Sequence, residues 1–160
     1  MPRPAVRVGI GFDVHPFGDD RRLVLGGVTI EGLGLLGHSD ADVVAHAVAD
    51  ALLGASGMPD LGTLFPSADD RYQGADSMIL LAEVGARVRG AGWQVVNVDV
   101  VVAAEQPRLG PHVRMMVDNL TLAIGSEPGS VSVKPKRAEG LGAIGRAEGI
   151  AVWAVALLER

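Results

Sequence analysis

Residues 6–15 read VRVGIGFDVH, and this stretch decides how the chain begins to fold. Apolar residues at positions 6, 8, 10 and 12 alternate with Arg, Gly, Gly and Asp, a period of two that predicts a half-buried strand. Asp13 and His15 should share one face at the end of this strand, opposite Phe12 and Val14, and lie over a cleft. Taken alone, the pair also fits an Asp that simply orients a neighbouring His.

The patterns that follow predict an α+β fold. They indicate, in chain order, a hairpin or one bent strand over 23–30, a helix from 39 to about 53, a helix over 76–90, a strand over 93–104, a helix over 111–124, a strand over 130–134 and a helix over 147–159. Ser39 and Asp42 form a variant capping box, and Gly54 lies near the end of that first helix. Residues 55–75 and 135–145 are expected to be loops, the first long enough to suggest a function. We expect a mixed β-sheet packed against helices in a single two-layer domain over residues 1–160.

Composition excludes several classes of protein. Lys and Arg number 14 against 19 Asp and Glu, a net charge of −5, and the scattered cations argue against a nucleic-acid partner. There is no cysteine, so any metal must be held by His and carboxylates. The longest apolar run, residues 150–158, is far shorter than the roughly 20 residues of a membrane span. Residues 1–7 lack the apolar region of a secretory signal, so we expect no membrane partner and a cytoplasmic location.

The glycine pattern G-x-G-x-x-G occurs twice, at 32–37 and 140–145. A dinucleotide site would also need a returning strand with an acidic residue roughly 20 residues further on, and neither match has one. The glycines therefore indicate only backbone N–H groups near a helix start, where phosphate binds favourably.

Two groups of residues could carry chemistry. Asp13, His15 and His46 would give a zinc ion three protein ligands and an open fourth position, as in a catalytic site. By itself, His46 on an Ala-rich helix also fits a half-buried histidine with no metal, although Asp42, His46 and Asp50 share one helical face. The run KPKRAE at 134–139 is either a solvated basic loop or a diphosphate clamp in which its Glu helps to hold a divalent cation.

Several separated motifs, in the same order along the chain, resemble the 2-C-methyl-D-erythritol 2,4-cyclodiphosphate synthase family over about residues 5–158. They are GFDVH at 11–15, HSDADV at 38–43 with His46, DLG at 60–62, LFP at 64–66, GADS at 74–77, NVD at 97–99, PRL at 107–109, PH at 111–112, EGLG at 139–142 and GR at 145–146. The resemblance implies a homotrimer with each active site between neighbouring subunits. It also implies a small-molecule, cytidine diphosphate-linked substrate, 4-diphosphocytidyl-2-C-methyl-D-erythritol 2-phosphate, whose own 2-phosphate closes the ring and releases CMP in non-mevalonate isoprenoid synthesis.

The resemblance further implies roles for individual residues. Zn²⁺ would be bound by Asp13, His15 and His46, where it would polarise the β-phosphate. Glu139 would hold Mg²⁺ or Mn²⁺ across the diphosphate, and the catalytic residues would be His38, Arg137 and Glu139. Residues 104–110 would form the cytosine pocket, and residues 60–62 and 65–69 would cover the erythritol. Substrate contacts are expected from Asp13, His15, His38, Ser39, Asp60, Leu61, Gly62, Phe65, Pro66, Ser67, Ala68, Asp69, Ala104, Glu105, Gln106, Pro107, Arg108, Leu109, Gly110, Lys136, Arg137, Ala138, Glu139, Ala143 and Arg146.

The chain departs from the family pattern at two places. Consecutive threonines usually precede the Glu, one of which helps to stabilise the transferring phosphoryl group, whereas this chain has Lys136, Arg137 and Ala138. We hypothesise that Arg137 supplies charge-assisted donors instead. Ser67 stands where a carboxylate commonly follows the Phe-Pro pair. Two alternative functions stay open: a zinc-dependent phosphohydrolase, and a trimeric metal- and nucleotide-binding homologue that has lost catalysis.

Overall fold

The computed structural model describes residues 5–18 and 20–160. Residues 1–4, which form part of the segment used above to argue against a secretory signal, lie outside the described residues. The strands are β1 (Val6–Gly18), β2 (Leu23–Leu25), β3 (Val28–Ile30), β4 (Gly34–Leu35), β5 (Gln94–Ala103), β6 (Val131–Lys136) and β7 (Gly149–Glu159). The helices are α1 (Val43–Ser56), α2 (Leu61–Leu64), α3 (Ser77–Gly90), α4 (Val113–Ile124) and α5 (Gly142–Gly145), with single 3₁₀ turns η1 (Asp70–Tyr72) and η2 (Gly110–His112).

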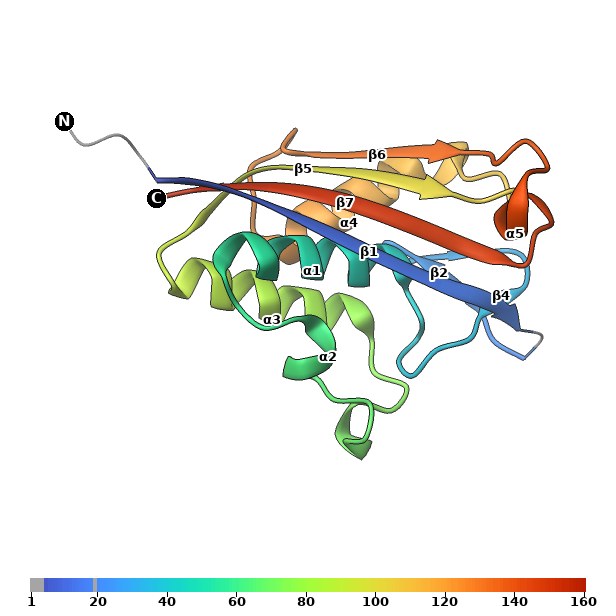
Figure 1. The fold of residues 1–160 in the computed structure, drawn as a ribbon, viewed down its shortest axis with the longest axis horizontal. Coiled ribbons are helices and arrows are strands. Elements are labelled where there is room, and N and C mark those ends of the chain that lie inside the picture. The colour runs from blue at the N-terminus through green and yellow to red at the C-terminus, as the bar shows by residue number, and fades with distance from the viewer. Residues whose placement is uncertain (1–4, 19) are drawn as a thin grey trace.

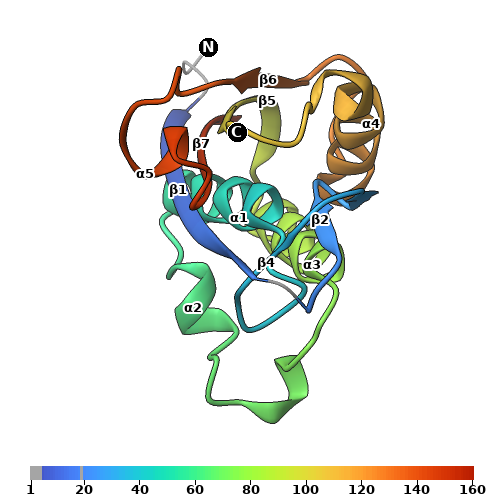
Figure 2. The same cartoon turned by 90° about the vertical axis from the view of Figure 1, so that its right-hand side faces the viewer.

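Five strands form one mixed sheet in the order β4-β1-β7-β5-β6 (Figure 1). The long strand β7 pairs antiparallel with β1 and with β5, and β5 pairs parallel with β6. Strands β2 and β3 form the separate hairpin that was one of the two predictions for residues 23–30. The three long helices lie on one side of the sheet (Figure 2), so the predicted α+β fold, a mixed sheet packed against helices, is confirmed.

Glycine on β1 and alanine on α1 bring these two elements unusually close. A Cβ atom on Gly11 would lie 1.9 Å from the carbonyl oxygen of Ala47, and one on Gly9 would lie 2.0 Å from that of Ala51. Such distances exclude any side chain at either glycine unless the helix moves. This contact holds the first turn of α1, which carries His46, against the far end of β1.

The faces of β1 are the reverse of those expected. The glycine and polar face packs against α1, whereas the apolar face is exposed, with Val8 66% and Ile10 69% accessible. On β7, exposed Trp153 and Val155 pair with Phe12 and Ile10 and extend this uncovered apolar surface. The prediction failed because a helix packed this closely needs glycines beneath it, so burial did not follow hydrophobicity.

The predicted helix over 147–159 is wrong, because this segment forms the central strand β7. Its inward positions, among them Ile150, Val152 and Leu158, are fully buried, and small or apolar residues also occupy most outward positions. A strand that is apolar on both faces has no visible period of two and cannot be distinguished from a buried helix by pattern alone. The mixed sheet nevertheless stands, and it contains two strands that the sequence did not predict, β4 and β7.

Other boundaries also differ from the sequence predictions. Asp42 alone caps α1, because its side chain accepts hydrogen bonds from the backbone N–H groups of Val44 and Ala45. The capping box with Ser39 does not form. The helix continues to Ser56 and ends at Gly57 in the left-handed conformation, beyond Gly54. The expected loop over 55–75 contains α2 and η1, and the one over 135–145 contains the end of β6 and α5. Over the described residues, no helix combines the length and apolar character needed to cross a membrane.

Candidate metal and phosphate site

Three potential metal ligands meet where the end of β1 faces the start of α1. The carboxylate oxygen Oδ2 of Asp13 lies 2.9 Å from Nε2 of His15 and 2.9 Å from Nδ1 of His46. All three ligand atoms lie within 4.8 Å of one another, and the side chains are partly buried. The group can therefore hold a metal ion, as the spacing of these residues suggested.

Buried Asp42 fixes the position of His46 at the start of α1. Its carboxylate accepts hydrogen bonds from Val44 and Ala45 in the helix, at 3.1 and 3.0 Å. It also accepts hydrogen bonds from the backbone N–H groups of Gly26 and Gly27 in the β2–β3 turn, at 2.9 and 2.7 Å. Burial raises the pKa of this carboxyl, partly offset by those N–H donors. Asp42 thus ties the hairpin to the helix that carries the ligand, and is not itself one of the three ligands.

Hydrogen bonds within the ligand group shift the pKa values of Asp13 and His15. Burial alone would raise the pKa of Asp13, but hydrogen bonds from His15 and His46 outweigh it and hold that pKa well below its ordinary value. The hydrogen bond to Asp13 raises the pKa of His15, and burial opposes this effect. The group is therefore an ionised carboxylate between two imidazoles, a donor set suited to a divalent cation such as zinc.

The outer ring nitrogens of both histidines have hydrogen-bond partners. Nδ1 of His15 lies 2.5 Å from the carbonyl oxygen of Leu36, to which it can only donate. Nε2 of His46 lies 2.9 Å from Oγ of Ser77 and 3.1 Å from Oγ of Ser39. With the outer nitrogens engaged as donors, the inner nitrogens are the ones that would give up their protons to a metal and direct lone pairs at the shared site. Metal-binding histidines are usually held in this way, so the residues present fit a metal.

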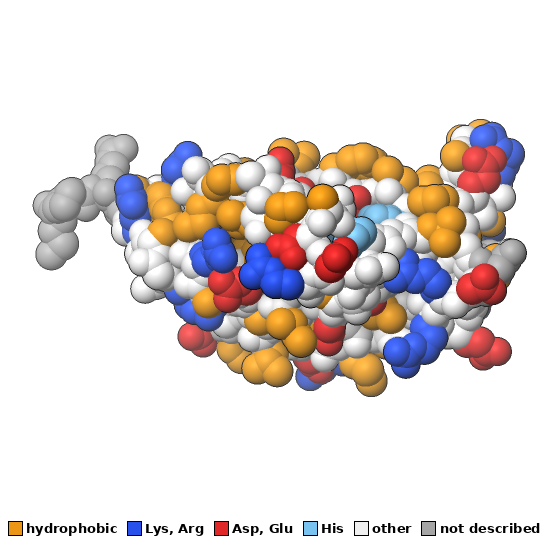
Figure 3. Space-filling model, turned by 90° about the horizontal axis from the view of Figure 1, so that it is seen from below, with side chains coloured by type: hydrophobic (Ala, Val, Ile, Leu, Met, Phe, Trp, Pro, Cys, Tyr) orange, Lys and Arg blue, Asp and Glu red, His pale blue; other side chains and the backbone are white. Residues whose placement is uncertain are grey.

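A small pocket of about 200 Å³ opens beside the ligand group. Its lining residues are His15, His38, Ser39, His46, Leu61, Gly62, Phe65, Ser67, Tyr72 and Leu80. All but Tyr72, Leu80 and the ligand His46 were predicted to contact substrate. Figure 3 shows histidine side chains reaching the surface on this face, next to a carboxylate and between apolar side chains.

Helix α2 shapes the outer wall of this pocket. Asp60 caps the helix by accepting a hydrogen bond from the N–H of Thr63 at 2.7 Å, and Asp50 on α1 accepts one from Leu61 at 2.8 Å. Beyond α2, the ring of Phe65 meets that of Tyr72 edge-on, with centroids 5.3 Å apart. Pro66, Ala68 and Asp69 lie in the intervening segment, where Asp69 pairs with Arg71 at 2.6 Å.

Of the other predicted substrate residues, 104–110, 136 and 137 gather at the ends of β5 and β6, Ala138 and Glu139 follow β6, and Ala143 lies in α5. A hollow of about 530 Å³ at these strand ends is lined by residues 104–111 and 135–137. Glu105 accepts hydrogen bonds from Nε of Arg137 at 3.0 Å and from the backbone N–H of Ala138 at 3.1 Å. The hydrogen bond from Arg137 lowers the pKa of Glu105. Exposed Glu139 follows with a positive φ of 53°, and further along Arg146 pairs with Glu148 at 2.6 Å.

Within a single chain these two groups of residues stay separate. The pocket beside the ligand group and the hollow at β5 and β6 share no lining residue. Glu139 is not part of the three-residue ligand group found among residues 5–18 and 20–160. Within one chain the potential metal ligands therefore lie apart from the hollow that was predicted to take the cytosine.

Ser77 is the residue near the ligands that the sequence did not single out. It lay in the predicted helix start and in the GADS motif but was given no role, yet its hydroxyl lies within hydrogen-bonding distance of His46. Ser77 is 31 residues from His46 along the chain, so no spacing rule could have connected them.

A comparison with known families agrees with this geometry. The model of the YgbB family matches residues 6–159, which is nearly the whole chain. The chain belongs to the YgbB family. The resemblance to cyclodiphosphate synthases seen in the sequence is thereby confirmed.

Curated YgbB relatives include enzymes with one and with two functions. The 2-C-methyl-D-erythritol 2,4-cyclodiphosphate synthase of Bordetella avium is 56% identical over 155 residues, covering 96% of this chain and 96% of its own. The bifunctional enzyme IspD/IspF of an Anaeromyxobacter species is 53% identical over 155 residues, covering 97% of this chain, which spans only 40% of that enzyme. Among solved structures, the IspF of Plasmodium falciparum in a CDP complex superimposes with a TM-score of 0.85 at 32% identity, covering 99% of this chain and 98% of its own.

Proposed function

We propose that this chain is a 2-C-methyl-D-erythritol 2,4-cyclodiphosphate synthase. The observation that carries the proposal is the Asp13, His15 and His46 group beside a pocket formed by family motifs. The named relatives and the CDP complex of a structural neighbour support a cytidine diphosphate-linked substrate. In the proposed reaction an oxygen of the 2-phosphate forms a bond to the β-phosphorus. The bond from that phosphorus to the α-phosphate oxygen breaks, and CMP leaves.

Asp13, His15 and His46 would hold zinc in this proposal. When bound, zinc supplies Lewis acidity at a phosphate oxygen. His38 and Ser39 line the same pocket and would donate hydrogen bonds to phosphate. Because the nucleophile belongs to the substrate, the protein needs to neutralise charge and hold the reacting groups in line, and needs no nucleophile of its own.

Assembly of three copies would unite the metal ligands with the β5 and β6 hollow. The uncovered apolar face of β1 and β7, with Ile10 69% and Trp153 42% exposed, is a surface that isolated chains rarely leave in water. We propose that this face is buried in a homotrimer, in which the β5 and β6 hollow of one subunit meets the metal group of its neighbour. The cytosine would then occupy residues 104–110, and Glu139 would hold Mg²⁺ or Mn²⁺ on the diphosphate.

Arg137 takes the role of the missing threonine hydroxyl in this account. Glu105 binds its guanidinium and holds it at the rim of the β5 and β6 hollow. A guanidinium fixed there can donate charge-assisted hydrogen bonds to phosphoryl oxygens. The cytoplasmic location expected from the sequence stays a prediction.

Identifying the product by mass spectrometry tests the proposal against its alternatives. Incubation with the substrate, zinc and magnesium should release CMP and a cyclic diphosphate. A zinc-dependent phosphohydrolase, favoured only by the open coordination of the ligand group, would yield a linear product heavier by one water. Binding of substrate without turnover would indicate the homologue that has lost catalysis. A His46→Ala variant, which lacks one ligand, should form no product.

A further inference from the structure

We propose that Ser77 is a positioning residue that links His46 to the carboxylate of Asp40. The two hydrogen bonds from His46 to Ser77 and from Ser77 to Asp40 are called the relay below. Ser77 is the first residue of α3 and is 1% exposed. Its Oγ lies 2.9 Å from Nε2 of His46 and 2.5 Å from Oδ1 of Asp40. The inference rests on the metal site of the proposed function, and is independent of the cyclisation itself.

The chemistry of the three groups sets the direction of both hydrogen bonds. An ionised carboxylate can only accept, so the hydroxyl of Ser77 donates its proton to Asp40. Oγ of Ser77 then accepts from the N–H at Nε2 of His46. Nδ1, which donates to Asp13 over 2.9 Å in the metal-free protein, is then the nitrogen that would offer its lone pair when a metal takes the place of that proton. The relay therefore selects the one neutral form of His46 that can bind a metal at the shared site.

The carboxylate of Asp40 is held independently of any substrate. Oδ2 accepts a hydrogen bond from the backbone N–H of Ser77, and Oδ1 accepts one from Asp42, both at 3.2 Å. The backbone N–H of Asp40 itself donates to the carbonyl of Ala75 at 3.0 Å. The chain on both sides of the relay is thus tied together, and a negative charge behind the hydroxyl makes His46 a stronger ligand.

Ser77 also leaves Ser39 available for substrate. Oγ of Ser39 lies 2.9 Å from Oγ of Ser77 and 3.1 Å from Nε2 of His46, so it could take over the relay only by giving up other contacts. With Ser77 as the principal acceptor from His46, the Ser39 hydroxyl is free to turn toward a phosphate in the adjoining pocket.

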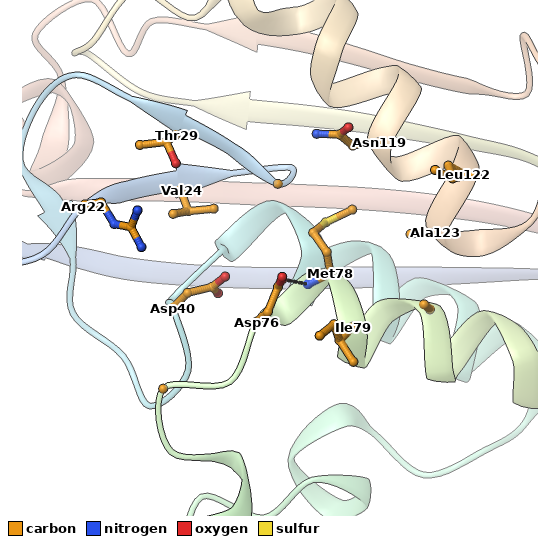
Figure 4. A pocket seen from close by; sticks show the side chains of 13 residues that line it. Arg22, Val24, Thr29, Asp40, Asp76, Met78, Ile79, Asn119, Leu122 and Ala123 are labelled. Atoms are coloured by element: carbon orange, nitrogen blue, oxygen red, sulfur yellow. Dashed lines mark hydrogen bonds between the residues drawn. The ribbon is translucent and has the colours of Figure 1, made fainter.

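Helix capping and the relay fall on neighbouring residues, which provides a matched control. Asp76 caps α3 by accepting a hydrogen bond from the N–H of Met78 at 2.8 Å, as Figure 4 shows. Asp76 and Asp40 both line a separate hollow of about 710 Å³. Among the hydrogen bonds of the described residues, none joins Asp76 to His46. An Asp76→Ala change should therefore weaken the start of α3 and leave the relay in place.

The test measures zinc affinity, by competition with a chromophoric chelator, and the visible spectrum of the cobalt-loaded protein. The variants are Ser77→Ala, Ser77→Thr, Asp40→Asn and Asp76→Ala, each also melted without metal. Ser77→Ala should lose about 10- to 100-fold in zinc affinity, the usual effect of removing such an outer partner, and its cobalt spectrum should change. Ser77→Thr keeps the hydroxyl and should recover most of the affinity, whereas Asp40→Asn should lose less than Ser77→Ala. Asp76→Ala should melt at a lower temperature with wild-type zinc affinity.

Three results would overturn the inference. Wild-type zinc affinity and an unchanged cobalt spectrum in Ser77→Ala would show that His46 needs no such partner. Equal losses in Ser77→Ala and Asp76→Ala would show that Ser77 acts only through helix stability. Failure of the wild-type protein itself to bind zinc would remove the metal site and the relay with it. Zinc binding that depends on Ser77, in a protein that forms no cyclic product, would uphold the relay and contradict only the proposed reaction.

Discussion

The close approach of α1 to β1 makes Gly11→Ala the most informative single substitution. The new Cβ atom would lie 1.9 Å from the carbonyl oxygen of Ala47, where ordinary contact begins at about 3.4 Å. The helix must therefore retreat by roughly 1.5 Å at this point, next to the turn that carries His46. Metal–ligand distances tolerate only about 0.2 Å, so the retreat would separate His46 from Asp13 and His15.

We expect Gly11→Ala to lower the free energy of unfolding by about 3 kcal/mol, the upper end of the usual range for overpacking. Zinc affinity should fall by at least about 10-fold, which corresponds to about 1.4 kcal/mol. Thermal unfolding of the metal-free protein and chelator competition measure the two effects separately. Gly9→Ala is the matched control, because its Cβ meets Ala51 at 2.0 Å, one helical turn farther from His46.

Gly9→Ala should therefore be destabilised to a similar extent and lose less zinc affinity than Gly11→Ala. Zinc binding by Gly11→Ala as tight as that of the wild-type protein would contradict this coupling between β1 and His46. Equal losses of affinity in both variants would also contradict it, because the effect would then come from global instability and not from the position of the ligand.

Three further predictions concern assembly, rate and pH. Ile10→Asp should yield monomers in light scattering, whereas Leu122→Asp, at an exposed site on α4, should leave the assembly intact; a wild-type mass for Ile10→Asp would contradict the trimer. Arg137→Ala should lower turnover by about 10²- to 10³-fold, and unchanged turnover would show that its assigned role is wrong. Hydrogen bonding to Asp13 raises the pKa of His15, so their pair stabilises the metal-free protein below about pH 6.5 and this contribution disappears as the pH rises through the higher folded pKa. The melting temperature of metal-free protein should therefore fall over that interval, and His15→Gln should flatten the decline.

Local patterns predicted the elements that carry the metal ligands. The alternation over 6–15 and the helical spacing around His46 placed Asp13, His15 and His46 on two elements, and the shared site needed only that these elements pack together. The sequence could not predict which face of β1 is buried. The glycines against which α1 packs interrupt the hydrophobic pattern and therefore do not look like core positions. β7 was missed since a strand apolar on both faces carries no period of two.

The remaining features that the sequence could not predict depend on contacts between distant parts of the chain. Ser77 reaches His46 through tertiary packing of α3 against α1, and nothing in the local sequence around either residue signals the other. The separation of the metal ligands from the β5 and β6 hollow is likewise a property of the folded chain, visible only once the ends of β5 and β6 and the end of β1 have been placed.

Time-resolved ³¹P NMR of the protein with 4-diphosphocytidyl-2-C-methyl-D-erythritol 2-phosphate, zinc and magnesium distinguishes cyclisation from hydrolysis and from binding without turnover. For a cyclodiphosphate synthase, the resonances of CMP and of the cyclic diphosphate should grow together and at equal rates, because one bond exchange produces both. CMP accompanied only by linear phosphates, or substrate that binds and stays intact, would contradict the proposed function.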